Sequence, residues 1–384
     1  MSALARLPVA ELPAIIAQMI NRPDDANRYM NLSRLFSVVG NQDFALEMQT
    51  RALQMSTVYR IASTIRPAIR LLALMGAGAQ SVNTPLDYLV ENSDIQLDLL
   101  YITPEQPQPA CIPEHDVAIV ALGESDDNRH VLEIIERLTE NWHRPILNPA
   151  RHVLNNSRDG VYQRLKDSPG LLIPPTHRIS RADLTRVANM QLAIDKLIDG
   201  TYPITIRPLV SQGGRGLARI HNAAELSDYL NASGDAAFFI SLYIDYRSAD
   251  GLYRKARIAL IDGIPCICHL AISENWVVHF GSSNMTDSVH KRGEEAQFMS
   301  DFDTGFASRH RAALKVIADK LELDYVVIDC AETNDGELLL FEADNRGWVH
   351  ATDSIELFPY KQTPMNKVFT AFRTLLLKKM ANTQ

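Results

Sequence analysis

Three acidic residues near the C-terminal end have the spacing of ligands for a hard cation. Asp329 ends the apolar run YVVID, and Glu342 and Asp344 lie in the run ELLLFEAD, with an Asn-Asp-Gly turn signal between the runs. The two runs are expected to pair as a hairpin, and residues two apart on a strand share a face. Clustered carboxylates in a partly buried site repel one another unless protons or a cation neutralise them. Magnesium prefers such oxygen ligands, so we predict a magnesium site rather than a solvated acidic hairpin.

A second candidate is the glycine-rich segment YPITIRPLVSQGGRGLARI at 202–220. Arg207 lies on its first predicted strand, and the loop that follows contains Ser211, Gln212, Gly213, Gly214 and Gly216. Glycines let backbone N–H groups approach phosphates closely, because no Cβ stands in the way. Arg207 would add positive charge at the same place. Glycine-rich hairpins are common, so this segment alone does not identify a nucleotide site.

The third candidate region, residues 245–295, is rich in cations and histidines. It contains Arg247, Asp250, Tyr253, Arg254, Lys255, Arg257, His269, His279, Lys291 and Arg292. Tyr253, Lys255 and Arg257 alternate along one predicted strand and therefore share a face. His269 and His279 are candidate proton acceptors for an incoming amine, although a single histidine on a strand is more often structural. The histidines lack the spacing of a three-histidine zinc site.

Composition narrows the functional classes. The 384 residues carry a formal net charge of −8, which disfavours nucleic acid as the main partner because phosphate contacts require an excess of Lys and Arg. Four cysteines, at 111, 266, 268 and 330, form no zinc pattern and are expected to be small buried residues in a reducing compartment. We find no signal-peptide pattern and no apolar run of membrane length. These features predict a cytoplasmic protein with no membrane partner.

The N-terminal part is predicted to comprise a helical region and a small sheet. Residues 1–70 read as helical, with two amphipathic helices in 27–56 joined by a turn at Gly40 and Asn41. This pair matches part of a tetratricopeptide unit, but only one unit is evident, so a helical cap is favoured over a peptide-binding array. Residues 71–150 alternate between strands and helices, which predicts a small parallel sheet. The predicted strands are 71–78, 95–102, 116–124 and 144–150, and the predicted helix is 130–142. The Gly-Ala-Gly turn of 76–78 is too short for a dinucleotide fingerprint.

Residues 151–384 are predicted to mix many strands with a few helices. The predicted strands include LLIPPT, YPITIRPL, GLARI, AAFFISLYI, KARIALIDG, IPCICHLAI, WVVHF, YVVIDCAE and ELLLFEAD, and the predicted helices are 183–198, 308–323 and 364–380.

In this order and spacing, the candidate segments resemble the ATP-grasp superfamily over about residues 155–380. PITIRP followed by QGGRG is similar to its cationic strand and phosphate loop, and DYVVID and LLFEADNRG are similar to its metal-binding strands. The segment FFISLYID resembles the adenine-binding hinge, which would contain Ser241, Leu242, Tyr243 and Ile244. KARIALIDG resembles the corresponding segment of ribosomal-protein glutamate ligases. YRSADGLYRKARI, CHLAISENWVVHF, LLLFEADNRGWVHATD and YKQTPMNKVFTAFRTLL extend the resemblance to bacterial ATP-grasp proteins that carry an N-terminal tetratricopeptide-like region.

The resemblance implies a fold and a domain plan. It implies an α/β (α+β) ATP-grasp fold with an N-terminal helical region and a small parallel-sheet pre-ATP-grasp domain. The implied domains are 1–70, 71–150 and 151–384, the last divided into a central part, 151–235, and a C-terminal part, 236–384.

The resemblance also implies ATP and Mg²⁺ as cofactors and a carboxylate–amine ligase that forms an acyl phosphate. The partners would then be a carboxylic acid and an amine, and peptide docking on the N-terminal helices and a homodimer are further options. Asp329, Glu342 and Asp344 would hold the metal, and Arg257, Lys255 and His269 would act in catalysis. Arg207 and either Arg158 or Arg164 would bind the nucleotide.

Two departures from the superfamily pattern keep other functions open. Arg207 stands where lysine is usual, and the metal motif reads Glu-Ala-Asp, with Asn345 displaced by one position. The alternatives are a peptide-modifying enzyme, a small-molecule kinase, or an inactive helical-repeat interaction protein.

Overall fold

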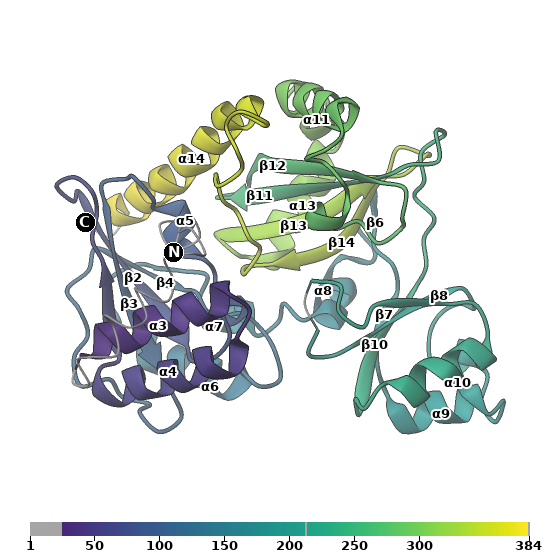
Figure 1. The fold of residues 1–384 in the computed structure, drawn as a ribbon, viewed down its shortest axis with the longest axis horizontal. Coiled ribbons are helices and arrows are strands. Elements are labelled where there is room, and N and C mark those ends of the chain that lie inside the picture. Colours follow the sequence, from purple (N-terminus) through teal and green to yellow (C-terminus); the bar gives the residue numbers. More distant parts are fainter. Residues whose placement is uncertain (1–24, 212, 383–384) are drawn as a thin grey trace.

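The computed structural model describes residues 25–211 and 213–382, which form three sheets covered by helices (Figure 1). The N-terminal sheet has the strand order β1-β3-β2-β4-β5, the central sheet β7-β10-β8-β9, and the C-terminal sheet β12-β11-β13-β14-β6. Figure 1 shows the central sheet with its helices below the C-terminal sheet, and the N-terminal sheet beside both.

The N-terminal sheet is parallel apart from one edge strand. Its strands are β1 (Val58–Ile61), β2 (Ile69–Gly76), β3 (Ile95–Ile102), β4 (Val117–Val120) and β5 (Ile146–Leu147). Strands β2 to β5 pair in parallel, whereas β1 pairs antiparallel with β3. Seven of the eight residues in β2 and in β3 are buried, as expected for a parallel sheet covered on both faces. The predicted parallel sheet is confirmed, but the helical prediction is wrong at 58–61, where β-forming residues pair with the edge of β3.

Helices cover both faces of this sheet. One face packs against α3 (Ala26–Val38), α4 (Gln42–Met55) and α5 (Leu86–Leu89), and the other against α6 (Arg129–Thr139) and α7 (Ala150–Val153). A short 3₁₀ turn, η2 (Gln80–Val82), follows β2. The predicted pair α3 and α4 is confirmed: Asp25 and Asn41 cap their N-termini, and Gly40 between them has φ +81°.

The central sheet is antiparallel and is covered by two helices. Its elements are α8 (Arg158–Leu165), β7 (Thr176–Ser180), α9 (Arg181–Ala188), η3 (Ile194–Lys196), β8 (Ile204–Pro208), β9 (Ala218–Ile220), α10 (Ala223–Ala232) and β10 (Ala237–Leu242). Leu184 of α9 and Leu226 of α10 pack against Ile206 and Phe238 in its core. The helix predicted at 183–198 ends early, because the chain turns at Met190 in the left-handed region, φ +57°.

The C-terminal sheet carries the predicted acidic hairpin. Its strands are β6 (Leu171–Leu172), β11 (Tyr253–Ile261), β12 (Ile264–Ser273), β13 (Tyr325–Glu332) and β14 (Leu338–Asp344), all antiparallel except β6. The remaining elements are η4 (Phe280–Ser282), α11 (Val289–Asp301), α12 (Phe306–Arg309), α13 (Arg311–Leu321), η5 (Pro359–Lys361) and α14 (Gln362–Ala381). The segment WVVHF, predicted as a strand, forms none and leads into η4.

Helix α14 joins the C-terminal and N-terminal sheets. Its residues Met365, Val368 and Phe372 lie in one apolar cluster with residues of β2, β3, β11 and β13. Within residues 25–211 and 213–382, no helix has both the length and the apolar character of a membrane span. Of the four cysteines, the three at 266, 268 and 330 are buried as predicted, whereas Cys111 is exposed.

Candidate active site

A cavity of about 530 Å³ collects many of the predicted site residues. Its lining includes Gly213 of the glycine-rich loop, Arg257, His269, His279, Asp329, Glu342 and Asp344. Segments from all three sheets therefore contribute to one cavity. Ser81 comes from η2, which follows β2 of the N-terminal sheet, and Gly213 comes from the loop between β8 and β9 of the central sheet.

The hairpin of β13 and β14 places two of the carboxylates side by side. Asp329 and Glu342 are direct cross-strand partners, and Asp344 pairs with Val327. Direct partners on neighbouring antiparallel strands point to the same face, with their Cβ atoms about 5 Å apart. The turn between the strands contains Gly336 with φ +79°, a backbone conformation that glycine adopts readily.

Asp329 is buried and held by two cations. Arg257 donates to both of its carboxylate oxygens, at 2.8 and 3.0 Å, and the Nζ of Lys255 lies 3.1 Å away. Burial alone would raise the pKa of Asp329, but Lys255 and Arg257 outweigh burial and hold the pKa well below its usual range. The aspartate is therefore ionised at neutral pH, and Arg257 is oriented by it.

The other two carboxylates each have an arginine partner. Arg158, at the start of α8, donates to Glu342. Arg346 donates to both oxygens of Asp344, at 2.7 to 3.1 Å. Burial alone would raise the pKa of Asp344, but Arg346 reverses the effect and lowers it.

The donor atoms suit a magnesium ion, but their present arrangement does not gather them. In the described part of the chain, no three acidic, histidine or cysteine side chains form a metal-binding group. Each predicted ligand instead faces an arginine or lysine. A bound cation would have to take the place of these partners, so the magnesium site stays a prediction.

Arg207 lies near the end of β8 in the central sheet, and its side chain contacts the glycine-rich loop. Its Nη2 donates to the carbonyl oxygen of Ser211 at 2.6 Å and to the Oγ at 3.2 Å. Burial, together with the nearby charge of Arg158, lowers the pKa of Arg207 to about 10. A partly desolvated cation of this kind binds an anion more strongly than one in water.

The glycine-rich loop has the backbone conformation that its glycines permit. Gly213, Gly214 and Gly216 have φ values of +60°, +75° and +70°. A Cβ at Gly216 would stand 2.8 Å from Pro208, so this position has no room for a side chain. Gln212, the remaining predicted loop residue, lies outside the described residues.

The predicted hinge lies where the central sheet gives way to the C-terminal sheet. Ser241 shares a hydrogen bond of 2.7 Å with Thr176, and the N–H of Tyr243 donates to a carbonyl oxygen of the segment before β8. The guanidinium of Arg219 stacks 4.7 Å from the Tyr243 ring centroid. The other two predicted hinge residues pack on opposite sides of this junction: Leu242 against the central core and Ile244 against the apolar cluster beneath β13 and β14.

The two candidates for the second nucleotide-binding cation are clearly separated. Arg158 contacts Glu342 and lies close enough to Arg207 for the two charges to interact. Arg164 donates instead to the Lys320 carbonyl oxygen, on another side of α8. The geometry therefore favours Arg158.

Several cations proposed from the sequence are engaged elsewhere. Arg247 pairs with Asp245, Arg254 with Asp250 and Glu294, and Lys291 with Glu274, while Arg292 donates to backbone carbonyls. None of these four arginine and lysine residues lines the cavity. Their inclusion rested on nearness in sequence alone, and the structure does not bring them to the site.

The two candidate histidines do line the cavity. Burial and the adjacent positive charge of Arg257 hold the pKa of His269 well below its usual range, and burial also lowers the pKa of His279. Both imidazoles are therefore neutral near pH 7, the state in which a histidine accepts a proton.

Sequence reasoning missed residues that follow β14. Arg346, Trp348, His350 and Asp353 line the cavity. Asn345 does not line the cavity: its side chain donates to the carbonyl oxygen of Leu122, just after β4, at 3.2 Å. Arg346 is two residues after the predicted ligand Asp344. This nearness in sequence was the one signal that could have identified Arg346 as a site residue.

Comparisons with known proteins bear on the fold. No protein-family model matches the sequence, and no curated protein matches it. Among solved structures, the D-alanine–D-alanine ligase from Coxiella burnetii is similar with a TM-score of 0.51 at 11% identity, over 82% of this chain and 96% of that one. A RimK domain ATP-grasp protein from Sphaerobacter thermophilus has a TM-score of 0.47 at 13% identity, over 80% and 99% of the two chains. With the central antiparallel sheet facing a second sheet that carries the acidic hairpin, the chain has the ATP-grasp fold.

Proposed function

We propose that the protein is an ATP-dependent carboxylate–amine ligase, which joins an acid and an amine through an acyl phosphate and releases ADP and phosphate. The observation that carries the proposal is the shared cavity, in which the acidic hairpin meets Arg257 and the glycine-rich loop. A phosphoryl transfer needs fixed cations around the transferring group and exclusion of water. The cavity offers the fixed cation Arg257, and closure of the glycine-rich loop over it would exclude water.

In this proposal the cations change partners when the nucleotide binds. Arg207 contacts the glycine-rich loop at Ser211, and Arg158 is close enough for its charge to act on Arg207, so both would bind the phosphates. Arg257, whose two bonds to Asp329 the metal would replace, would turn to face the transferred phosphoryl group. A bound magnesium ion, held by Asp329, Glu342 and Asp344, would supply charge neutralisation of the phosphates.

The remaining groups act on the acceptor and on solvent. A neutral His269 or His279 would accept the proton that the amine loses when it attacks the acyl phosphate. The glycine-rich loop approaches the segment that follows β12, since a Cβ on Gly214 would stand 3.7 Å from a Val277 methyl group. Closure of this loop would exclude the water that hydrolyses acyl phosphates.

The test is ATP turnover with a panel of acids and amines. Phosphate release that requires an acid, together with hydroxamate formation when hydroxylamine replaces the amine, is the expected result. Arg207→Gln should reduce this turnover by about 100-fold, the scale of losing one transition-state cation, whereas Arg207→Lys should retain most of it. MgATP binding without phosphate release from any acid–amine pair would reject the ligase proposal.

One observation favours a second candidate, a nucleotide-binding protein without catalysis. All three predicted metal ligands are neutralised by arginines of the chain itself, Arg257, Arg158 and Arg346. A site that keeps these pairs would not need a metal. In that case ATP would bind equally well with EDTA present, and no acid would stimulate phosphate release.

A further inference from the structure

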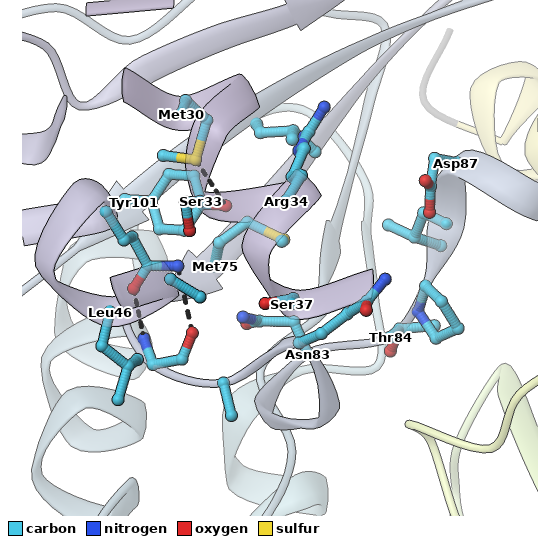
Figure 2. A pocket seen from close by; sticks show the side chains of 18 of the residues that line it. Met30, Ser33, Arg34, Ser37, Leu46, Met75, Asn83, Thr84, Asp87 and Tyr101 are labelled. Atoms are coloured by element: carbon cyan, nitrogen blue, oxygen red, sulfur yellow. Dashed lines mark hydrogen bonds between the residues drawn. The ribbon is translucent and has the colours of Figure 1, made fainter. Parts of the chain in front are cut away.

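Two connecting segments form part of the wall of the large cavity. Gly213 belongs to the glycine-rich loop between β8 and β9, and His279 and Gly281 belong to the segment 276–281 after β12. A smaller cavity, of about 70 Å³ under α3 and α4, is lined mainly by residues of helices and strands (Figure 2). The shape of the large cavity therefore depends, more than that of the small one, on the contacts that hold two connecting segments in place.

Arg219 joins the end of the glycine-rich loop to the segment 276–281. It lies on β9, which follows the loop, and its guanidinium carbon is 4.7 Å from the ring centroid of Tyr243 and 5.6 Å from that of Trp276. The two rings meet edge-on, with their centroids 5.6 Å apart. Among residues 25–211 and 213–382, the Arg219 guanidinium has neither a salt bridge nor a hydrogen bond. Its acidic neighbour Asp245 pairs with Arg247 instead, at 2.5 Å. The position of the guanidinium is therefore set by the aromatic rings, whose faces attract a cation.

Trp276 is fixed to the C-terminal sheet. The Tyr246 hydroxyl donates to the Trp276 carbonyl oxygen at 2.8 Å. Tyr246 is buried, and its ring centroid lies 4.9 Å from that of Tyr253 on β11 and 4.8 Å from that of Phe341 on β14. Phe341 directly precedes Glu342, one of the predicted magnesium ligands. Trp276 is therefore a fixed point on the sheet that carries the acidic hairpin.

The loop and the segment 276–281 approach each other at a second point beside the first. Val277 directly follows Trp276, and one of its methyl groups would be 3.7 Å from a Cβ on Gly214. We propose that Arg219 is a positioning residue, which holds the glycine-rich loop against Trp276 and thereby keeps the loop and His279 in place around a bound nucleotide. The nucleotide in this inference rests on the proposed function, whereas the contact between Arg219 and Trp276 does not.

Trypsin cleavage of the full chain tests this contact without any ligand. Arg215 is exposed in the loop, and a protease cuts such a site when the loop leaves its docked position. Arg219→Gln removes the cation from both rings, so cleavage after Arg215 should be at least about fivefold faster. Arg219→Lys keeps a cation over the rings and should stay closer to the wild type. The matched control is Arg186→Gln on α9, where Arg186 pairs with Asp183 at 3.3 Å, and it should be cleaved like the wild type.

Two results of the cleavage experiment would overturn the inference. One is an unchanged rate of cleavage after Arg215 in Arg219→Gln. The other is equal acceleration at every tryptic site, or in Arg186→Gln as well, which would show a general loss of stability rather than release of the loop.

Calorimetric titration with MgATP tests the consequence for the large cavity. Arg219→Gln should raise the Kd of MgATP at least about fivefold, and Trp276→Leu should raise it less, because Tyr243 remains. The double variant should resemble Arg219→Gln alone, since both changes remove one shared contact, and Trp276→Phe should retain most of the affinity. Faster cleavage after Arg215 with an unchanged Kd would overturn the positioning role. A wild type that does not bind MgATP would reject the proposed function, and the cleavage rate alone would then decide whether Arg219 holds the loop.

Discussion

Removal of the Arg257 guanidinium should destabilise the C-terminal sheet strongly. Asp329 has 8% of its side chain exposed and accepts two hydrogen bonds from Arg257. Arg257→Gln leaves this carboxylate buried with Lys255 as its one remaining cation, at 3.1 Å. Breaking a buried ion pair costs about 3–5 kcal/mol, because the remaining charge is uncompensated. Since Lys255 stays in place, we expect the lower end, about 3 kcal/mol.

Urea unfolding followed by the fluorescence of the three tryptophans measures this loss. Trp348 is close to the pair, because its carbonyl oxygen accepts a bond of 3.2 Å from Arg257. The control is the exposed pair of Arg309 and Glu332, with 55% and 31% of the side chains exposed. Arg309→Gln should cost less than about 1 kcal/mol.

A double-mutant cycle separates the pair from its surroundings. Asp329→Asn with Arg257→Gln should cost clearly less than the sum of the two single changes, because the double variant leaves neither the Asp329 carboxylate nor the Arg257 guanidinium uncompensated. Lys255 loses its carboxylate partner in Asp329→Asn and in the double variant alike, so that loss cancels in the cycle. Additive losses, or a loss in Arg257→Gln no greater than in Arg309→Gln, would refute the electrostatic account of this pair.

Three further predictions concern Gly216 of the glycine-rich loop, the buried His269, and the close approach of Gly123 to Arg346. Gly216→Ala should lower the free energy of unfolding by about 1–3 kcal/mol. The backbone at Gly216 has φ +70°, and a Cβ there would stand 2.8 Å from Pro208. An unchanged midpoint of urea unfolding would contradict this backbone conformation. Burial and the charge of Arg257 hold the pKa of His269 well below its usual range, so the unfolded chain binds a proton there that the folded chain does not. This one group should lower stability by at most about 1.4 kcal/mol per pH unit as the pH falls below about 6.5. His279, His310 and His350, whose pKa values burial also lowers, add to the decline. His269→Gln should flatten that decline, and an identical pH profile would count against the buried neutral state. Gly123→Ala should displace Arg346, whose side-chain atoms would lie 2.0 to 2.5 Å from the new Cβ, and should cost about 1–3 kcal/mol in urea unfolding; a neutral result would show that Arg346 moves freely.

The parts of the fold that follow from local pattern were predictable. Strand β3 was predicted to the residue, because a parallel strand buried on both faces is a continuous apolar run. The four residues of β1 were not, because so short a strand depends on the edge that β3 offers it. The end of α9 at Ala188 was also missed, since the left-handed turn at Met190 depends on the packing of the segment that follows.

The site was predictable where its residues lie on one hairpin. Asp329 and Glu342 share a face because of strand periodicity and turn position, both of which are local. The arginine that pairs with Glu342 is 184 residues away in sequence, and no spacing rule links the two. Similarly, the choice of Arg158 over Arg164 depends on which side of α8 faces the cavity, and a helix of eight residues with little amphipathic pattern does not reveal this.

The most direct measurement is the change in unfolding temperature on adding MgATP. A ligand that binds only the folded chain stabilises it by about 2.7 kcal/mol at a concentration 100 times its Kd. Wild type and the control Glu337→Gln, an exposed residue on the turn of the same hairpin, should show equal stabilisation that EDTA removes. Glu342→Gln should lose most of it. Equal stabilisation of Glu342→Gln and wild type, or full stabilisation of the wild type by ATP in EDTA, would contradict the assignment of this hairpin as the magnesium–ATP site.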